Sequence, residues 1–212
     1  MQAEFWIERW RDGRIGFHEG QPNRFLVRHG ERLGERRRVL VPLCGKTDDL
    51  AWLAERGHSV VGIELVEDAV RAFFEEHRVT PTVRQRGSHI EYTAGEITVF
   101  AGDLLAASAN LIGPIDAVYD RAALVAMPPE LRPRYAAHVR SLVGPGSPGL
   151  VVTLEYPHDQ MVGPPFSVSE TELRESYGTA TLLDQAPDDR LRERGATAIE
   201  RCWAVTLPIQ RP

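Results

Sequence analysis

The chain has 212 residues, a formal net charge of −5 at pH 7 and a hydrophobic content of 42%. This composition predicts one globular domain over residues 1–212 rather than a disordered chain. The acidic balance argues against a nucleic-acid partner, and we expect neither a signal peptide nor a membrane span. The two cysteines, Cys44 and Cys202, lack metal-ligand spacing, so we expect reduced thiols in a cytoplasmic protein without a metal.

Residues 1–30 are predicted to form a helical segment that precedes the sheet. We expect a helix over residues 3–12 and a second, shorter helix over residues 23–29. Two interpretations of the tryptophans in this segment, Trp6 and Trp10, stay open. Either they pack against an edge of the sheet, or they belong to a lid over the end of the sheet where α/β proteins bind ligands.

A strand–turn–helix–strand unit is predicted between residues 39 and 64. The apolar run at residues 39–43 predicts a buried parallel strand, and residues 44–46 form a tight turn. A helix then leads to a second apolar strand at residues 59–64. Such a unit is the half-site that binds a nucleoside in doubly wound α/β proteins.

Glu64 ends the second strand and indicates which ligand this unit binds. It follows Gly45 by 19 residues, close to the spacing of about 20 expected for an acid that binds a ribose. The turn contains one glycine rather than the three of a dinucleotide fingerprint, which argues against NAD, FAD and ATP. A nucleoside without phosphates fits better, and S-adenosylmethionine is the candidate.

The rest of the chain predicts an α/β fold over residues 38–212, with a mostly parallel central sheet, helices on both faces and an antiparallel C-terminal edge strand. The further elements expected are a helix over residues 66–77, a hairpin within 79–102 with arms at 90–92 and 97–100, a strand over 115–119, a helix over 130–142, a strand over 150–156, a helix over 169–177, a strand over 181–184, a polar loop over 190–195 and a strand over 199–207.

Four strand ends offer polar groups towards one edge of the sheet. They are the turn at Leu43, Cys44 and Gly45, then Glu64, then Asp103, and then Asp120 with Arg121. Because the carboxyl ends of parallel strands converge on the ligand crevice, we expect these residues to form one site. Each also has a structural interpretation: Asp103 as a turn residue, Glu64 as an exposed acid, and Arg121 as a surface ion pair with Asp120.

Six segments match a known family in order along the chain. They are residues 5–10, 16–18, 41–46, 57–64, 119–126 and 163–166. On these segments the chain resembles the bacterial form of the thiopurine S-methyltransferase family. The resemblance implies a single-domain class I, Rossmann-like methyltransferase that uses S-adenosylmethionine. The implied acceptors are aromatic and heterocyclic thiols such as thiopurines, together with selenium and tellurium compounds, and we expect a monomer.

The resemblance also implies roles for individual residues. Trp10, Leu43, Glu64 and Arg121 match cofactor contacts, Asp103 and Leu104 match positions beside the adenine, and Phe17 and Arg190 match positions beside the acceptor. Positive charge at Arg121 and Arg190 would favour an acceptor that has already lost its proton, so we assign both to catalysis. Ala122 stands where animal members of the family usually have glycine, and we expect this difference to matter little.

Alternatives stay open at the level of function and of single residues. The chain could be a halide or small-thiol methyltransferase of the same fold, or a non-catalytic S-adenosylmethionine-binding protein. Cys44 is interpreted as a small buried residue rather than a nucleophile. His18 is either a base or a loop residue, and Lys46 points either to solvent or to an anionic group of a ligand.

Overall fold

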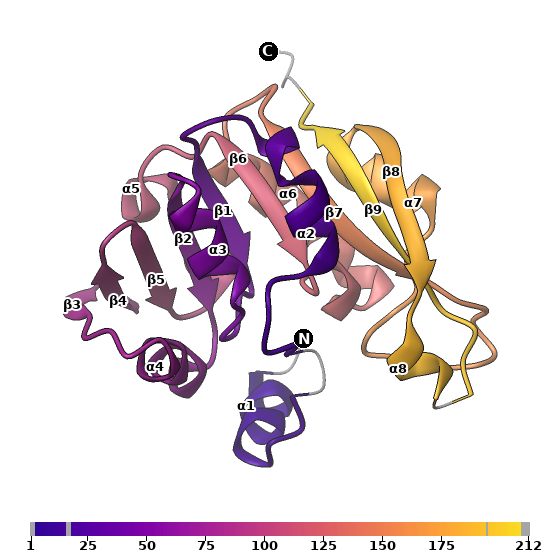
Figure 1. Ribbon diagram of the computed structural model, residues 1–212, viewed down its shortest axis with the longest axis horizontal. Helices are drawn as coiled ribbons and strands as arrows, with labels where there is room; N and C mark the ends of the chain where they lie inside the picture. Colours follow the sequence, from indigo (N-terminus) through magenta and orange to yellow (C-terminus); the bar gives the residue numbers. More distant parts are fainter. Residues whose placement is uncertain (1–2, 16–17, 194, 209–212) are drawn as a thin grey trace.

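In the described part of the chain, residues 3–15, 18–193 and 195–208, the strands form one nine-stranded sheet in the order β3-β4-β5-β2-β1-β6-β7-β9-β8. Figure 1 shows this computed structural model. Five neighbouring strands run parallel, as predicted. They are β5 (Ile97–Ala101), β2 (Ser59–Glu64), β1 (Arg38–Pro42), β6 (Ala117–Arg121) and β7 (Pro148–Glu155).

Antiparallel strands extend the sheet at both edges. One edge consists of β3 (Thr82–Arg86) and β4 (His89–Ala94), and β4 forms the predicted hairpin with β5. The sequence analysis missed β3, whose residues are exposed and carry no apolar pattern. At the other edge, β8 (Thr179–Pro187) pairs with β9 (Ile199–Thr206).

The last strand corrects one detail of the predicted sheet. β9 lies between β7 and β8, so it is one strand in from the edge. It pairs with β7 over eight residues and with β8 on its other side. Its two faces are covered by packing, since Trp203 belongs to the core on one side of the sheet and Cys202 to the core on the other. Cys202 and Trp203, which are adjacent in sequence, are accordingly both buried. The alternating pattern of residues 199–207 predicts a half-exposed antiparallel strand, and this prediction is wrong at the centre of β9.

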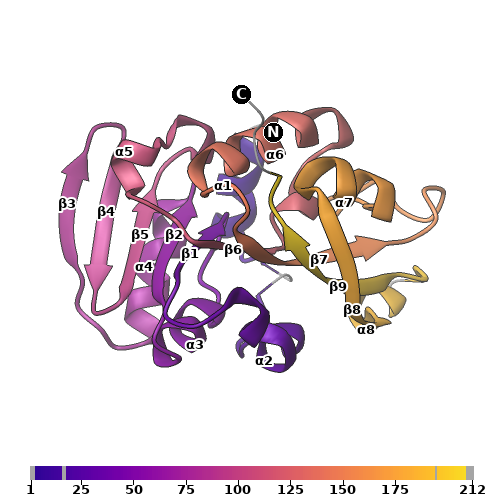
Figure 2. The ribbon, with the colours of Figure 1, turned by 90° about the horizontal axis from the view of Figure 1, so that it is seen from above.

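Helices cover both faces of the sheet, as Figure 2 shows. On one face lie α2 (Arg24–His29), α3 (Asp49–Glu55) and α4 (Glu67–Glu76); on the other lie α5 (Ala109–Ile112), α6 (Arg132–Leu142) and α7 (Glu170–Tyr177). Successive residues of a strand point to opposite faces. On β1, Val39 and Val41 therefore pack with the first set of helices and Leu40 with the second. This explains why the central strands are apolar at every position.

Side-chain caps set where several helices begin. The Asn23 side chain accepts a hydrogen bond from the N–H of Phe25 at the start of α2. At α7, Ser169 and Glu172 form a capping box. Short 3-10 helices cover Gly30–Leu33, Leu104–Ala106, Leu124–Ala126 and Pro129–Leu131.

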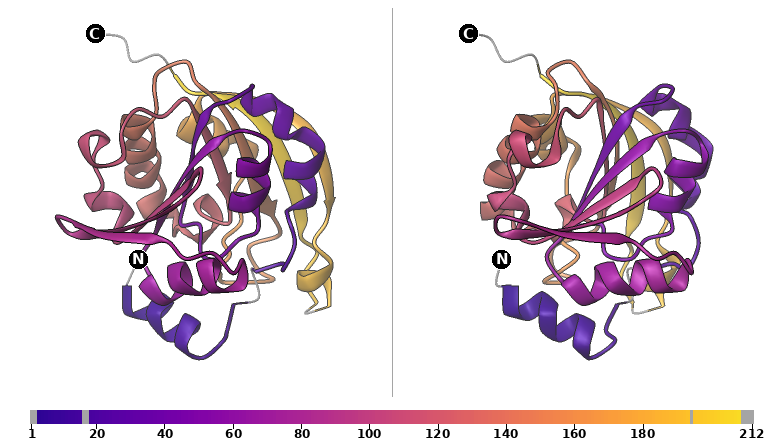
Figure 3. Two further views of the ribbon diagram at one scale, coloured as in Figure 1. Left: turned by 60° about the vertical axis from the view of Figure 1, so that its left-hand side comes forward. Right: turned by 90° about the vertical axis from the view of Figure 1, so that its left-hand side faces the viewer.

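Two short helices lie beyond the carboxyl ends of the parallel strands (Figures 1 and 3). The first is α1 (Ala3–Arg11), and the second is α8 (Asp189–Arg192). The sequence analysis predicted residues 190–195 as a polar loop, which is wrong for the residues of α8. The Asp188 side chain caps this helix by accepting from the N–H of Leu191 at 3.0 Å. Among the described residues, no helix is both long and apolar enough to cross a membrane.

Candidate active site

A cavity of about 750 Å³ opens at the carboxyl ends of β1, β2 and β6. Its volume lies in the range of about 300–1,000 Å³ typical of sites for small molecules and cofactors. Its walls come from α1 and the loop after it, the turn after β1 with the start of α3, the ends of β2 and β6, the Leu124–Ala126 3-10 helix, the loop at Pro164 and Pro165, and α8. The lining includes Trp6, Trp10, His18, Leu43, Cys44, Gly45, Lys46, Asp49, Glu64, Arg121, Ala122 and Arg190. The cavity therefore combines most of the residues that were predicted to form one site.

Glu64 lies at the end of β2 with its carboxylate held by the backbone. Its Oε2 accepts from the N–H of Gly45 at 2.8 Å, and its Oε1 accepts from the N–H of Val66 at 2.9 Å. Burial raises the pKa of this carboxyl, and the backbone N–H groups oppose the shift. A buried acid fixed in this way can accept further hydrogen bonds from the hydroxyls of a ribose. Its position excludes the alternative that Glu64 is an exposed acid at a strand end.

Cys44 lies against β2 in the same turn. An added Cβ at Gly62 would come within 2.8 Å of the Cys44 Sγ, so the glycine makes room for the thiol. Burial, together with the charge of Glu64, raises the pKa of Cys44 well above its usual value. A thiol in this environment keeps its proton at neutral pH. Cys44 is therefore a packing residue rather than a nucleophile.

The aromatic residues of α1 contribute one wall of the cavity. Trp6 and Trp10 line it, and the ring of Phe5 packs edge-on against Trp6 with their centroids 5.3 Å apart. Figure 3 shows α1 beyond the strand ends rather than against an edge strand, which favours the lid interpretation over edge packing. Phe17, the predicted acceptor-side aromatic, lies outside the described residues.

His18 and Lys46 both line the cavity, and the charge of Lys46 acts on His18. Burial lowers the pKa of His18 from 6.5, and the charge of Lys46 lowers it further. The Nζ of Lys46 forms an ion pair with Glu76 of α4, and the Lys46 side chain is 13% exposed. Lys46 therefore does not point freely to solvent: a carboxylate of this chain binds it, and it also lines the cavity.

Arg121, the last residue of β6, is buried and faces the cavity. Its Nη2 donates to Oε1 of Glu19, which precedes α2. Burial acts to lower the pKa of Arg121, but the carboxylates of Glu19 and Asp49 outweigh it and the pKa is raised. The alternative of a surface ion pair with Asp120 was wrong.

Asp120 does not contribute to the cavity, although it adjoins Arg121. Its Oδ2 accepts from the hydroxyls of Tyr135 and Tyr177, and its Oδ1 accepts from the N–H of Leu124 at 3.0 Å. Neighbouring strand residues point to opposite faces, so only one of the pair can face the ligand. The expectation that Asp120 lies in the site was therefore wrong.

Asp103 and Leu104 follow β5, next to the end of β2, but neither lines the cavity. The Asp103 Oδ1 accepts from the N–H of Leu105 at 2.9 Å and caps a short 3-10 helix. Leu104 is part of the hydrophobic core. The contacts of Asp103 agree with its interpretation as a turn residue. The position of Asp103 and Leu104 beside the adenine of the cofactor stays a prediction.

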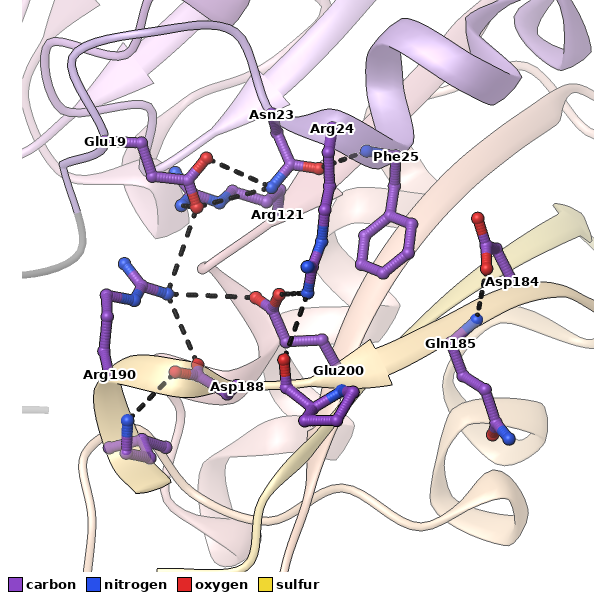
Figure 4. Close-up of polar contacts among 12 residues, drawn as sticks. Glu19, Asn23, Arg24, Phe25, Arg121, Asp184, Gln185, Asp188, Arg190 and Glu200 are labelled. Atoms are coloured by element: carbon purple, nitrogen blue, oxygen red, sulfur yellow. Dashed lines mark hydrogen bonds and ion pairs between the residues drawn. The ribbon is translucent and has the colours of Figure 1, made fainter. Parts of the chain in front are cut away.

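Arg190 on α8 is linked to Arg121 through one shared acid, Glu19 (Figure 4). Its Nη2 lies 3.3 Å from Oδ2 of Asp188, 3.8 Å from Oε1 of Glu200 and 3.9 Å from Oε1 of Glu19. The two arginines assigned to catalysis thus lie on either side of one carboxylate. Their separation in sequence gave no indication of this arrangement.

Four acids at or beside the site were missed by the sequence analysis, and one of them is Asp188, which lines the cavity and pairs with Arg190. Asp49 is buried and accepts from the N–H of Asn23 at 2.7 Å and from the hydroxyl of Tyr119 at 3.0 Å. Glu200 is buried on β9, but it follows the apolar Ile199 and therefore falls in the polar phase of the alternating strand, so no local signal marked it. Glu19 lies in the loop before α2, and no sequence pattern marked it as a site residue. No cluster of three or more His, Cys, Asp or Glu arranged to hold a metal occurs among the described residues.

Comparisons with known proteins agree on one family and one fold. A family model for thiopurine S-methyltransferase matches residues 1–204. A thiopurine S-methyltransferase of Pseudomonas aeruginosa is 49% identical over 189 residues, which cover 87% of this chain and 86% of that protein. The corresponding protein of Bordetella petrii is 43% identical over 209 residues, which cover 94% and 95%.

Solved structures are similar in fold at low sequence identity. A Burkholderia thailandensis 1,6-didemethyltoxoflavin-N1-methyltransferase, solved with its acceptor and S-adenosylhomocysteine, superposes with a TM-score of 0.67 at 17% identity, covering 98% of this chain and 87% of that one. A methyltransferase of Anabaena variabilis that depends on S-adenosylmethionine gives 0.65 at 14% identity, covering 98% and 95%. At these identities the likeness concerns the fold alone.

Proposed function

The chain belongs to the thiopurine S-methyltransferase family, and from this membership and the cavity we propose which of its residues carry out the reaction. The protein is an S-adenosylmethionine-dependent methyltransferase with the S-methyl transfer activity of its family. That assignment removes the alternative of a non-catalytic binding protein. The roles of single residues and the range of acceptors form the proposal.

Glu64, Leu43, Trp10 and Arg121 hold the cofactor in this proposal. The support is the buried Glu64 carboxylate, which the N–H of Gly45 orients at the edge of the cavity. An acid in this position suits the two hydroxyls of a ribose. The rings of Trp6 and Trp10 provide apolar surface with electron-rich faces, which suits a sulfonium and excludes water from it.

Arg121 and Arg190 act on the acceptor side. The observation that carries this assignment is that both line the cavity of Glu64 and lie on either side of Glu19. Positive charge favours the ionised form of a thiol, which is the nucleophile. We place Phe17 beside the acceptor on the family resemblance.

The cofactor supplies an electrophilic methyl group on a sulfonium. With the cofactor held by Glu64, Leu43, Trp10 and Arg121, the acceptor-side residues would hold the acceptor sulfur towards that methyl, so that transfer would form a new C–S bond on the acceptor as the C–S bond of the sulfonium breaks. No proton has to move during this step when the acceptor is already a thiolate. Cys44, whose pKa is raised by burial, takes no covalent part.

The acceptors that we propose are aromatic and heterocyclic thiols, with selenium and tellurium compounds as further acceptors. We also propose a cytoplasmic monomer. Both cysteines are free and buried, which suits a reducing compartment. The exposed large hydrophobic residues, such as Val27, Val83 and Val162, lie on separate elements rather than in one patch.

A comparison of acceptors tests the proposal. We expect kcat/KM for a heterocyclic aromatic thiol to exceed that for iodide or methanethiol, with S-adenosylhomocysteine as the co-product. Arg190→Ala should lower kcat/KM for the thiol about tenfold or more, the effect of removing one charged hydrogen bond. Higher efficiency with iodide than with every aryl thiol would instead identify a halide methyltransferase.

A further inference from the structure

A carboxylate of this chain occupies the space between the two acceptor-side arginines. Oε1 of Glu19 accepts from Nη2 of Arg121 and lies 3.9 Å from Nη2 of Arg190. The Asn23 side-chain amide lies 3.3 and 3.4 Å from the two Glu19 oxygens. Figure 4 shows Glu19 pointing towards both guanidinium groups. The Arg121 side chain is 8% exposed and that of Glu19 is 19% exposed, so little water competes for the pair.

Carboxylates of this chain already offset the arginines around Glu19 without any ligand, and the buried Asp49 adds a further negative charge that acts on Arg121. The ion pairs of this cluster connect three arginines with three carboxylates among the described residues: Arg24, Arg121 and Arg190 with Glu19, Asp188 and Glu200. An anionic acceptor therefore adds an unbalanced negative charge to a half-buried cluster. The anionic acceptor is fully attracted by Arg121 only when one of the three carboxylates moves away from the cluster.

Glu19 is the carboxylate whose side chain can move away from the arginines. Asp188 caps α8 through the N–H of Leu191 and is buried. Glu200 is part of β9, where Arg24 binds its Oε2 at 2.8 Å. Glu19 belongs to neither a helix nor a strand, and its partners are the Asn23 amide and the arginines. Its side chain can therefore turn towards solvent without breaking regular structure.

We propose that Glu19 determines acceptor specificity, as an internal counter-ion that an anionic acceptor displaces from Arg121. The proposal rests on the acceptor site described under the proposed function. Aromatic thiolates gain contacts with the cavity wall that offset this displacement. Small anions such as halides gain none, so Glu19 discriminates against them.

Binding to the complex of the enzyme with S-adenosylhomocysteine tests the proposal, because no turnover occurs in that complex. The ligands are 4-nitrothiophenol, which is ionised at neutral pH, and its neutral methyl thioether. The variant is Glu19→Gln, which keeps the shape and an acceptor for Asn23 but removes the charge. Glu35→Gln is the matched control, because Glu35 is exposed and precedes β1 at the end of the strand away from the cavity.

We expect Glu19→Gln to bind the thiolate about tenfold more tightly, the size of one charge-assisted hydrogen bond. The affinity for the thioether should change by less than about twofold, and inhibition by iodide should become stronger by a factor similar to that for the thiolate. Glu19→Ala should show the same direction, and Glu35→Gln should match the unaltered protein. Thermal denaturation with bound S-adenosylhomocysteine checks that each variant is folded.

Weaker binding of both ligands to Glu19→Gln would mean that Glu19 only positions Arg121, and the proposal would be wrong. Unchanged thiolate affinity would overturn it equally. Arg190→Ala separates this inference from the acceptor site on which it rests. If Arg190→Ala weakens thiolate binding while Glu19→Gln does not strengthen it, only the inference fails. If Arg190→Ala leaves the thiolate affinity unchanged, the acceptor site itself is misassigned.

Discussion

The carboxylate of Glu64, at the end of β2, accepts a hydrogen bond of 2.8 Å from the N–H of Gly45 in the turn after β1. Gly45 has a φ of +55°, in the left-handed region that favours glycine. The acid and the turn therefore fix one another across two neighbouring strands. The group that we assign to the ribose is oriented before the cofactor arrives.

Replacement of Glu64 by alanine should affect both cofactor binding and stability. Loss of hydrogen bonds from a charged group costs about 1.5–3 kcal/mol, so S-adenosylhomocysteine should bind about ten- to a hundredfold more weakly. The melting temperature should also fall, because the N–H groups of Gly45 and Val66 lose their buried acceptor. Calorimetric titration measures the affinity, and an unchanged value would remove Glu64 from the site.

Deletion of residues 1–18 should leave a folded protein without turnover. The deleted segment contains α1, whose tryptophans line the cavity, whereas the helices that cover the sheet begin with α2. Circular dichroism should therefore show nearly the same secondary structure, while methyl transfer to an aryl thiol is lost. Full activity of the shortened protein would show that Trp6 and Trp10 do not form a functional lid.

The pH dependence should report the acceptor rather than an enzyme base. Across a series of aryl thiols with pKa values above about 7, kcat/KM should rise with pH to each thiol's own pKa and then level off. The pKa of His18 is lowered from 6.5 by burial, so His18 is already neutral in that range and adds no inflection there. A single inflection below 6.5 for every thiol, abolished by His18→Gln, would identify His18 as the base and contradict this mechanism.

Ala122 should tolerate glycine but not valine. Its φ is +65°, which costs an L-residue about 1–2 kcal/mol, and glycine avoids this cost while losing about 0.5–1 kcal/mol of chain entropy. Ala122→Gly should therefore raise the free energy of unfolding by about 0–1.5 kcal/mol. This agrees with the expectation that Ala122 matters little where animal members of the family usually have glycine.

Thermal denaturation checks this prediction against a neighbouring residue. Ala123 has an ordinary φ of −88° and is buried, so Ala123→Gly should destabilise the protein. Ala122→Val should lower the free energy of unfolding by about 1–3 kcal/mol, because a branched side chain is strained in the left-handed region. A valine variant as stable as the unaltered protein would contradict the assignment of strain to Ala122.

The sequence alone determined the elements whose signals are local. The apolar run of β1, the turn at Gly45 and the end of β2 at Glu64 follow from hydrophobic pattern and spacing within 26 residues, and the structure confirmed them. The capping box at Ser169 was confirmed for the same reason. The segments that match the family, taken in order along the chain, identified the cofactor from the sequence alone.

Tertiary structure decided which polar residues meet. Arg121 faces the cavity and Asp120 does not, because the register of β6 in the sheet sets which side each occupies. Glu19 meets Arg121 across 102 residues of sequence, and no local propensity encodes that contact. Glu200 lies beside both arginines only because β9 inserts between β7 and β8. Strand order, register and packing depend on burial summed over the whole chain, and therefore the charge balance at the acceptor site could be read only from the folded protein.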